Sequence, residues 1–251
     1  MHQHLFILTG ASRGLGLAIA HQLVVPGNTL LCMSRSTNDA LAARASSASA
    51  TLVQWRQDLA LGARAGARLE QWLREQTSGN FASATLINNA GVMARIEPLS
   101  DADADDLSRT LRVGLEAPMQ LTSAFLRATH NWKAAKKVLN ISSGLGRRAM
   151  AAQAGYCAAK AGMDHFTRCV ALDEALKTNS AKVCSLAPGV IDTNMQIQLR
   201  SADANAFADR GTFVRLKETG SLASPEHAAR SVLDFLARAD FGTEVIADVR
   251  G

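Results

Sequence analysis

Short apolar runs alternate with longer amphipathic stretches along almost the whole chain. Seven apolar runs predict strands at 4–9, 29–33, 51–55, 84–88, 137–142, 182–187 and 244–248. The stretches between them predict helices at 14–24, 37–46, 60–77, 101–112, 116–129, 154–177 and 225–238. Strands that are apolar on both faces are typical of a parallel sheet covered by helices on both sides. No linker or repeat divides the chain, so the pattern predicts one doubly wound α/β domain over residues 1–251.

Three glycines follow the first predicted strand in the segment TGASRGLG, residues 9–16. Glycines between a strand and a helix permit a tight turn and let the backbone approach a pyrophosphate, while the helix N-terminus offers free N–H groups. This position at the first strand favours a dinucleotide site over an ordinary strand–helix turn, and hence a Rossmann-type fold. The expected binding residues here are Gly10, Ser12, Arg13, Gly14, Leu15 and Gly16.

The end of the second predicted strand indicates which dinucleotide is bound. Ser34 and Arg35 stand where an acidic residue would bind the ribose 2′-hydroxyl of NAD. An acid would repel a 2′-phosphate, whereas the guanidinium groups of Arg13 and Arg35 can hold it with charge-assisted hydrogen bonds. These residues favour NADP, although Arg35 also fits a solvated position at a strand end.

Polar residues also follow the third and fourth predicted strands. Asp58, which precedes Leu59, is suited both to accept a hydrogen bond from the adenine amino group and to cap the next helix. The segment NNAG follows the fourth strand, and its glycine lets the chain pass close to a cofactor. A structural role for Asn88 is as well supported as a cofactor contact. We include Asp58, Leu59, Asn89, Ala90 and Gly91 in the expected cofactor site.

The only tyrosine of the chain, Tyr156, has Lys160 one helical turn beyond it. For a tyrosine to exchange protons near pH 7 its pKa must fall by about 3, which corresponds to about 4 kcal/mol. A unit charge about 4 Å away, at an effective dielectric constant of about 20, interacts by about 4 kcal/mol. Lys160, helped by the positive nicotinamide ring of an oxidised cofactor, therefore suffices to make Tyr156 a general acid. Ser143, at the end of the fifth predicted strand, completes the expected catalytic set.

These motifs together resemble the short-chain dehydrogenase/reductase family over essentially the full length of the chain. The shared segments are TGxxxGxG, NNAG, the serine with Tyr-x-x-x-Lys, and APGVIDT at 187–193. The resemblance implies that Ser143 binds the substrate carbonyl oxygen and that Tyr156 transfers the proton. It also implies that Lys160 holds the ribose hydroxyls and lowers the pKa of the tyrosine. Pro188, Gly189, Ile191 and Thr193 would complete the cofactor site beside the nicotinamide.

Within that family, the segments MSRSTNDAL, YCAAKAG and FGTEVIADV resemble sepiapterin reductases and bacterial benzil reductases. The resemblance implies an NADPH-dependent reductase of ketones or vicinal diketones. It also offers Asp248 as a substrate-binding residue, because the matching aspartate of sepiapterin reductase holds the pterin ring. An aspartate at this strand end is also common in the family without touching substrate. Residues 194–222 are expected to form a loop that covers the substrate as a lid.

Gly114 departs from the family pattern, in which an asparagine supports a water molecule that links the lysine to solvent. We favour water filling the vacated space, which preserves the relay; the other possibility is a broken relay and a slow enzyme. A non-enzymatic NADP-binding sensor or partner-binding protein is therefore an alternative, although a sensor needs no catalytic residues. A 3-oxoacyl carrier-protein reductase is a further alternative, although Val249 stands where such enzymes usually have a glycine pair.

The composition narrows the kinds of partner, metal and compartment to be expected. The net charge of +5 is spread along the chain, which disfavours a nucleic-acid partner. The four cysteines form no CxxC pair, as expected of reduced cysteines in a cytoplasmic protein. Apart from His2 and His4 no histidines have metal-ligand spacing, and no apolar run approaches a membrane span, so neither a metal nor a membrane is expected.

In the family the helices 101–129 and 154–177 pair across a two-fold axis, which implies a homodimer or homotetramer.

Overall fold

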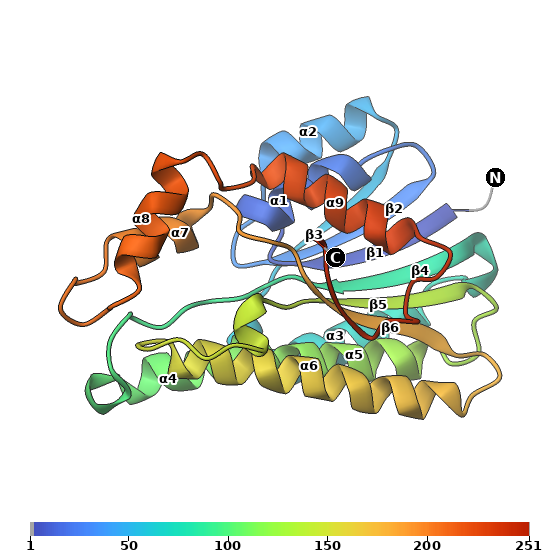
Figure 1. Ribbon diagram of the computed structural model, residues 1–251. Coiled ribbons are helices and arrows are strands. Elements are labelled where there is room, and N and C mark those ends of the chain that lie inside the picture. Colours follow the sequence, from blue (N-terminus) through green and yellow to red (C-terminus); the bar gives the residue numbers. More distant parts are fainter. Residues whose placement is uncertain (1–2, 251) are drawn as a thin grey trace.

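A parallel sheet forms the centre of the computed structural model, which describes residues 3–250 (Figure 1). Its strands are β1 (Gln3–Thr9), β2 (Asn28–Ser34), β3 (Thr51–Arg56), β4 (Phe81–Asn88), β5 (Ala135–Ile141), β6 (Ala181–Ala187) and β7 (Ile246–Asp248). They follow the order β3-β2-β1-β4-β5-β6-β7, with every neighbouring pair parallel. The predicted seven-stranded doubly wound sheet is confirmed. The strand order reverses between β1 and β4, and ligands of such sheets bind at the carboxyl ends beside this point.

Helices cover both faces of the sheet (Figure 1). One face carries α1 (Gly14–Leu23), α2 (Asp39–Ser47) and α9 (Pro225–Ala237). The other carries α3 (Gly62–Arg74), α4 (Ala104–Leu111), α5 (Ala117–Ala128) and α6 (Ala154–Ala175). No helix within residues 3–250 is long and apolar enough to cross a membrane.

Alternation along β1 shows how the sequence pattern builds two hydrophobic cores. Leu5 and Ile7 pack into the cluster under α3 and α5, whereas Leu8 and the partly buried Phe6 join the cluster under α1 and α9. Successive side chains of a strand point to opposite faces, so an apolar run supplies both cores at once. Each fully buried side chain of this size contributes about 1.5–3 kcal/mol.

Residues 194–222, which we expected to form a loop that covers the substrate, are largely helical. They contain α7 (Asn194–Arg200) and α8 (Arg210–Glu218), which extend beyond the carboxyl ends of the strands (Figure 1). Phe207 and Phe213 stack with ring centroids 5.7 Å apart and form a small core with Leu199. Short helices of mixed polarity give a weak sequence signal, because tertiary packing supplies most of their stability.

The helices predicted at 101–112 and 116–129 form one continuous helical segment. Residues 112–116, between α4 and α5, make a π-helical turn with Gly114 buried in it. α6 packs closely against this segment: a Cβ atom on Gly114 would lie 3.1 Å from the Ala159 Cβ atom, and one on Gly162 would lie 2.8 Å from Leu115 Cδ2. This packing fixes the N-terminal half of α6 against the segment that joins α4 and α5.

We expect Gly114→Ala to lower the free energy of unfolding by about 1 kcal/mol, because the added methyl overpacks the contact with Ala159. In an open helix the same change would stabilise by about 1 kcal/mol. Urea unfolding of Gly114→Ala, Ala159→Gly and the double variant measures the effect. The double variant should recover part of the lost free energy of unfolding. A Gly114→Ala variant that is more stable than the wild type would show that α6 can shift to accommodate the methyl group.

Candidate active site

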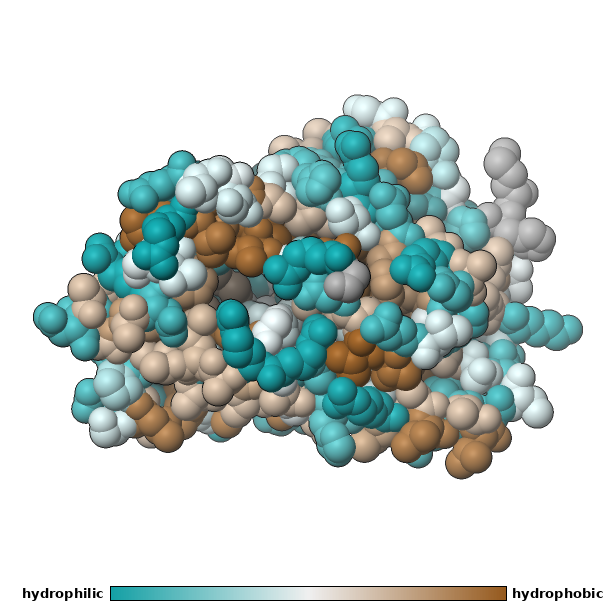
Figure 2. All heavy atoms as spheres, viewed as in Figure 1, coloured by the Kyte–Doolittle hydropathy of each residue, from teal (hydrophilic) through white to brown (hydrophobic). Residues whose placement is uncertain are grey.

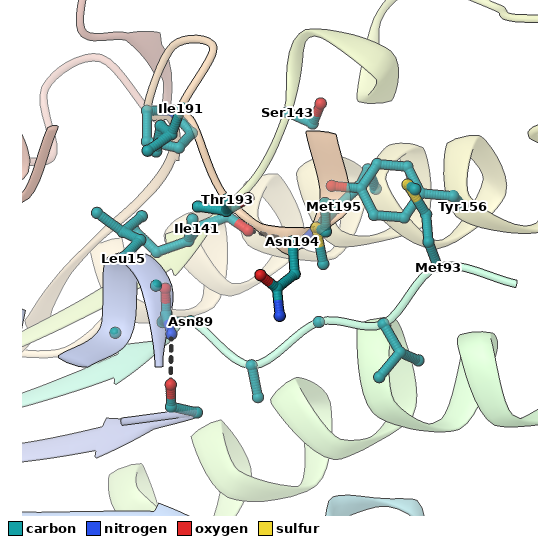
Figure 3. Close-up of a pocket in the computed structure, with 18 of the residues that line it drawn as sticks. Leu15, Asn89, Met93, Ile141, Ser143, Tyr156, Ile191, Thr193, Asn194 and Met195 are labelled. Atoms are coloured by element: carbon teal, nitrogen blue, oxygen red, sulfur yellow. Dashed lines mark hydrogen bonds between the residues drawn. The ribbon is translucent and has the colours of Figure 1, made fainter. Parts of the chain in front are cut away.

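The loop after β1 is held by the segment that follows β4. The backbone N–H groups of Asn89 and Ala90 donate to Thr9 Oγ1 at 2.9 and 3.0 Å, and Asn89 Nδ2 donates to the Thr9 carbonyl at 2.9 Å (Figure 3). Gly10 has φ of 71° and its Cβ atom would lie 2.9 Å from Ala90 Cα, so both conformation and space require glycine. The segments TGASRGLG and NNAG are thus held together as one rigid unit.

Asn88, for which the sequence left two roles open, has a structural one. Its Nδ2 atom donates to Thr122 Oγ1 at 3.1 Å and to Asn140 Oδ1 at 2.8 Å, and all three residues are buried. Asn140 in turn donates to Thr167 Oγ1 at 2.9 Å. The amides therefore connect β4 and β5 to α5 and α6 beneath the site.

A cavity of about 1070 Å³ opens at the carboxyl ends of the strands. Figure 2 shows its opening as a recess, with hydrophobic residues along the side formed by α7 and α8. Every catalytic and cofactor residue predicted from the sequence lines this cavity: Gly10, Ser12, Arg13, Gly14, Leu15, Gly16, Ser34, Arg35, Asp58, Leu59, Asn89, Ala90, Gly91, Ser143, Tyr156, Lys160, Pro188, Gly189, Ile191 and Thr193.

Asp248 is the one predicted site residue that does not line the cavity. Its carboxylate accepts hydrogen bonds from Arg250 Nε at 2.8 Å and Arg250 Nη2 at 2.7 Å, and Arg250 lines the cavity in its place. Hydrogen bonds from Arg250 lower the pKa of the Asp248 carboxyl. The aspartate is thus engaged within the protein, which the sequence could not show.

One end of the cavity fits a phosphorylated dinucleotide. Ser34 lines the cavity, and its Oγ atom is buried without a hydrogen-bond partner. The exposed guanidinium groups of Arg13 and Arg35 face the same cavity and have no acidic partner among residues 3–250. A buried hydroxyl without a partner and two free cations suit the ribose and 2′-phosphate of NADP.

Asp58 caps the short helical turn after β3, because its Oδ1 atom accepts from the Ala60 N–H at 3.0 Å. Arg109 Nη2 lies 3.9 Å from Asp58 Oδ2 and also lines the cavity. The capping role predicted for Asp58 is confirmed; contact with adenine stays a prediction.

The three predicted catalytic side chains meet at the other end of the cavity. Figure 3 shows Ser143 and Tyr156 close together, with Met93, Asn194 and Met195 around the tyrosine ring and hydroxyl. Ser143 is held by a hydrogen bond from the Leu145 N–H at 3.2 Å. Lys160 is buried, and its Nζ atom donates to the Ile141 carbonyl at 2.7 Å and lies 5.7 Å from the centroid of the Tyr156 ring.

Burial dominates the proton affinities of this pair. It raises the pKa of Tyr156 to about 12, while a hydrogen bond with Ser143 acts in the opposite direction. Burial lowers the pKa of Lys160 to about 8, and the charge of Asp164 opposes this shift. We expected Lys160 and an oxidised cofactor to lower the tyrosine pKa; in the protein alone, desolvation of the phenolate raises it.

The sequence did not reveal the apolar wall beside Tyr156. It is formed by Met93, Met150, Met195, Leu199 and Phe213, which all line the cavity. These residues come from four separate segments, and no local pattern distinguishes them from ordinary core residues. Methionine side chains adapt to ligands of irregular shape, so this end suits an apolar substrate.

Residues 3–250 contain no group of three or more His, Cys, Asp and Glu side chains arranged to hold a metal ion. Of the two histidines singled out by their spacing, His2 lies outside the described residues, and His4 Nδ1 is 2.8 Å from Ser83 Oγ.

Comparison with known proteins agrees with this geometry. A family model described as short chain dehydrogenase matches residues 4–204. The chain is 37% identical to the benzil reductase ((S)-benzoin forming) of Bacillus cereus over 235 residues, 94% of each chain. It is 30% identical to the sepiapterin reductase of Xenopus laevis, over 92% of this chain and 90% of that one. A short-chain dehydrogenase/reductase from Burkholderia vietnamiensis, 33% identical, superposes with a TM-score of 0.66 over 99% of this chain and 98% of its own. The motifs, the sheet and these relatives agree, and the chain belongs to the short-chain dehydrogenase family.

Proposed function

We propose that the protein is an NADPH-dependent carbonyl reductase acting on ketones or vicinal diketones, with Tyr156 as proton donor. The observation that carries this proposal is one continuous cavity that holds the glycine loop and free arginines at one end and Ser143, Tyr156 and Lys160 at the other. The similarity to a benzil reductase and a sepiapterin reductase supports a carbonyl substrate. A cofactor sensor would have no need for the catalytic trio.

The side chains divide the reaction between them. Ser143 and Tyr156 present hydroxyl groups to one place, where the substrate carbonyl oxygen would accept two hydrogen bonds. NADPH, when bound, supplies the hydride that reduces the carbonyl carbon. Tyr156 then gives its proton to the oxygen, on which negative charge develops. Lys160 stands beside Tyr156, where its ammonium group stabilises the charge left on the tyrosine oxygen.

The pKa of Tyr156 suits it to donate a proton during reduction. A proton donor must carry its proton, and a pKa raised to about 12 by burial keeps Tyr156 neutral at pH 7. Oxidation would need the tyrosinate as base, which the same burial disfavours. The positive nicotinamide ring of the oxidised cofactor would bring the pKa down again.

The apolar wall suggests which carbonyl compounds fit. Met93, Met150 and Met195 offer polarisable surface to an aromatic or branched substrate. Asp248 is not proposed as the anchor of a pterin ring, since Arg250 already occupies its carboxylate. We therefore favour apolar ketones and diketones over pterins.

We also propose a cytoplasmic homodimer or homotetramer, assembled through α5 and α6. Met119 on α5 and Leu172 and Leu176 at the end of α6 are exposed apolar residues; Leu172 is 72% and Leu176 88% exposed. Large apolar side chains exposed along two adjacent helices are typical of an interface between copies. The free cysteines are compatible with a reducing compartment.

Tyr156→Phe should reduce kcat with benzil and NADPH by about 10²–10⁴-fold, because the proton donor is lost while the ring remains. NADPH affinity, measured by fluorescence titration, should change little. Cys157→Ala, at the adjacent position of α6, serves as the control and should retain activity. A fully active Tyr156→Phe enzyme would disprove the proposed role.

Replacing Ser34 by Asp and Arg35 by Ala should shift the preference from NADPH toward NADH. Each charged hydrogen bond to the 2′-phosphate contributes about 1.5–3 kcal/mol, and the new carboxylate would repel the phosphate. The ratio of kcat/KM for the two cofactors measures the change, with Arg64→Ala on the remote helix α3 as control. Equal use of NADH and NADPH by the wild type would contradict the assignment.

Light scattering at micromolar concentration should give a mass of two or four chains. Leu172→Glu combined with Leu176→Glu should shift the mass toward a single chain, because charges in an apolar interface cost free energy. Arg74→Glu on α3, away from the proposed interface, is the matched control. A wild-type protein with the mass of one chain would refute assembly through these helices.

A further inference from the structure

A buried carboxylate lies one helical turn beyond Lys160 on α6. The side chain of Asp164 is 3% exposed. Its Oδ1 atom accepts hydrogen bonds from Ser142 Oγ at 2.5 Å and from Ser185 Oγ at 2.7 Å. Ser142 directly follows β5 and Ser185 belongs to β6. One oxygen atom of α6 therefore holds two neighbouring strands of the sheet at their carboxyl ends.

The second oxygen of this carboxylate has a different environment. Asp164 Oδ2 is buried without a hydrogen-bond partner, and its cationic neighbour is Arg147 Nε at 3.7 Å. A Cβ atom on Gly146 would come within 2.8 Å of it, so only glycine leaves room for the carboxylate. Burying a carboxylate is costly, and hydrophobic packing alone would not require one here. A role in the site explains its presence.

We propose that Asp164 is a positioning residue of the reductase, whose carboxylate fixes the strand end that carries Ser143 against α6 and keeps the ammonium group of Lys160 charged. This inference rests on the proposed function, because it assigns a part in the same reaction.

The positioning part follows from chain connectivity. Ser143 is bonded directly to Ser142, which is held both by Asp164 and by a backbone hydrogen bond to the Leu186 carbonyl at 2.8 Å. Tyr156 lies on the same helix as Asp164, two turns earlier. The carboxylate thus joins the element that presents the tyrosine to the segment that presents the serine. Loss of the clamp should loosen the distance between the two hydroxyl groups that receive the carbonyl oxygen.

The electrostatic part follows from what surrounds Lys160. Tyr156 and Asp164 face it on α6, Arg147 approaches Asp164 from the turn after Ser143, and Cys184 of β6 lies near the carboxylate. Burial raises the pKa of Cys184 to about 12, so its thiol carries no charge near neutral pH.

Glycines of the π turn and of the loop after β4 lie close to Ala159 and Lys160. Gly114 faces Ala159, and a Cβ atom on Gly91 would lie 3.9 Å from Lys160 Nζ. Gly114 also takes the place of the family's asparagine, so no amide side chain stands there. Among the groups around Lys160, Asp164 is the one that supplies negative charge.

The sign of the effect can be worked out. Burial lowers the pKa of Lys160 to about 8, and Asp164 opposes that shift. Without the negative charge of Asp164, Lys160 would release its proton at lower pH. Arg147 would then have lost its carboxylate partner, and its positive charge would further disfavour the charged form of Lys160. Carbonyl reduction that depends on charged Lys160 would then decline at lower pH than in the wild type. Above the midpoint, each lowering of the pKa by 1 reduces the charged fraction about tenfold.

Asp164→Asn tests the proposal, since asparagine keeps the size and one hydrogen-bond acceptor but removes the charge. Glu174→Gln is the matched control: Glu174 is also a buried carboxylate of α6, and it accepts hydrogen bonds from the Ala181 N–H at 2.7 Å and from Lys177 Nζ at 2.5 Å. Two readouts are compared. The first is the pH profile of kcat/KM with benzil and NADPH. The second is the titration of Lys160 by NMR in protein labelled with ¹³C at the lysine Cε, with the signal assigned by its loss in Lys160→Met.

We expect Asp164→Asn to move both the Lys160 midpoint and the alkaline decline of kcat/KM to lower pH. Glu174→Gln should leave both in place even if it unfolds more easily. Arg147→Ala, which removes a partly exposed side chain and its hydrogen bond to the Ala247 carbonyl, is expected to move the midpoint in the opposite direction. It keeps the proposal testable if Asp164→Asn fails to fold. An unchanged Lys160 midpoint in Asp164→Asn, or in Arg147→Ala, would overturn the inference.

Two further experiments distinguish the positioning role of Asp164 from its electrostatic role, and the inference from the proposed function. Ser142→Ala with Ser185→Ala removes the hydroxyl donors but keeps the carboxylate; kcat should fall while the Lys160 midpoint stays. An unchanged kcat would remove the positioning half of the proposal. If the wild type reduces no carbonyl compound, the proposed function fails, while a shifted Lys160 midpoint in Asp164→Asn would still establish the electrostatic coupling.

Discussion

The seating of α6 against the carboxyl edge of the sheet is the constraint on which the site depends. Tyr156, Lys160 and Asp164 lie on this one helix at intervals of one turn, and each contacts a different partner: Ser143, the Ile141 carbonyl, and the hydroxyls of Ser142 and Ser185. Close contacts with the π turn leave the helix little room to shift. The catalytic geometry is therefore a consequence of helix packing.

The same burial that fixes α6 also sets its chemistry. Desolvation acts on neighbouring groups in opposite directions, raising the pKa of Tyr156 and lowering that of Lys160. The tyrosine is thereby kept neutral and able to donate, whereas the lysine is left near the limit at which it holds its charge. The charge of Asp164 opposes this lowering and so helps to keep the lysine protonated.

Much of the fold and the cofactor end could be predicted because their signals are local. Alternation along β1 supplies both cores, and the spacing of Gly10, Gly14 and Gly16 follows directly from the turn they make. Tyr156 and Lys160 were also found from spacing, because residues four apart share a helix face.

Features that arise from tertiary contact were missed. α7 and α8 depend on Phe207 and Phe213 packing together. The pairing of Asp248 with Arg250 is local, but the hydrophobic pattern does not reveal it. Desolvation, which raises the pKa of Tyr156 in the protein without its cofactor, could not be read from the sequence either. Asp164 had a signal in its spacing from Lys160, but its value became clear only with Ser142 and Ser185 beside it.

The central claim is that this cavity brings a nicotinamide and a carbonyl carbon together for direct hydride transfer. The most direct test uses NADPH deuterated on the transferred position of C4, with benzil, and locates the label in the product by mass spectrometry and NMR. The account predicts one deuterium on the new carbinol carbon, and none on that carbon when unlabelled NADPH is used in heavy water. NADPH that binds without being oxidised, or a carbinol hydrogen that comes from solvent, would contradict it.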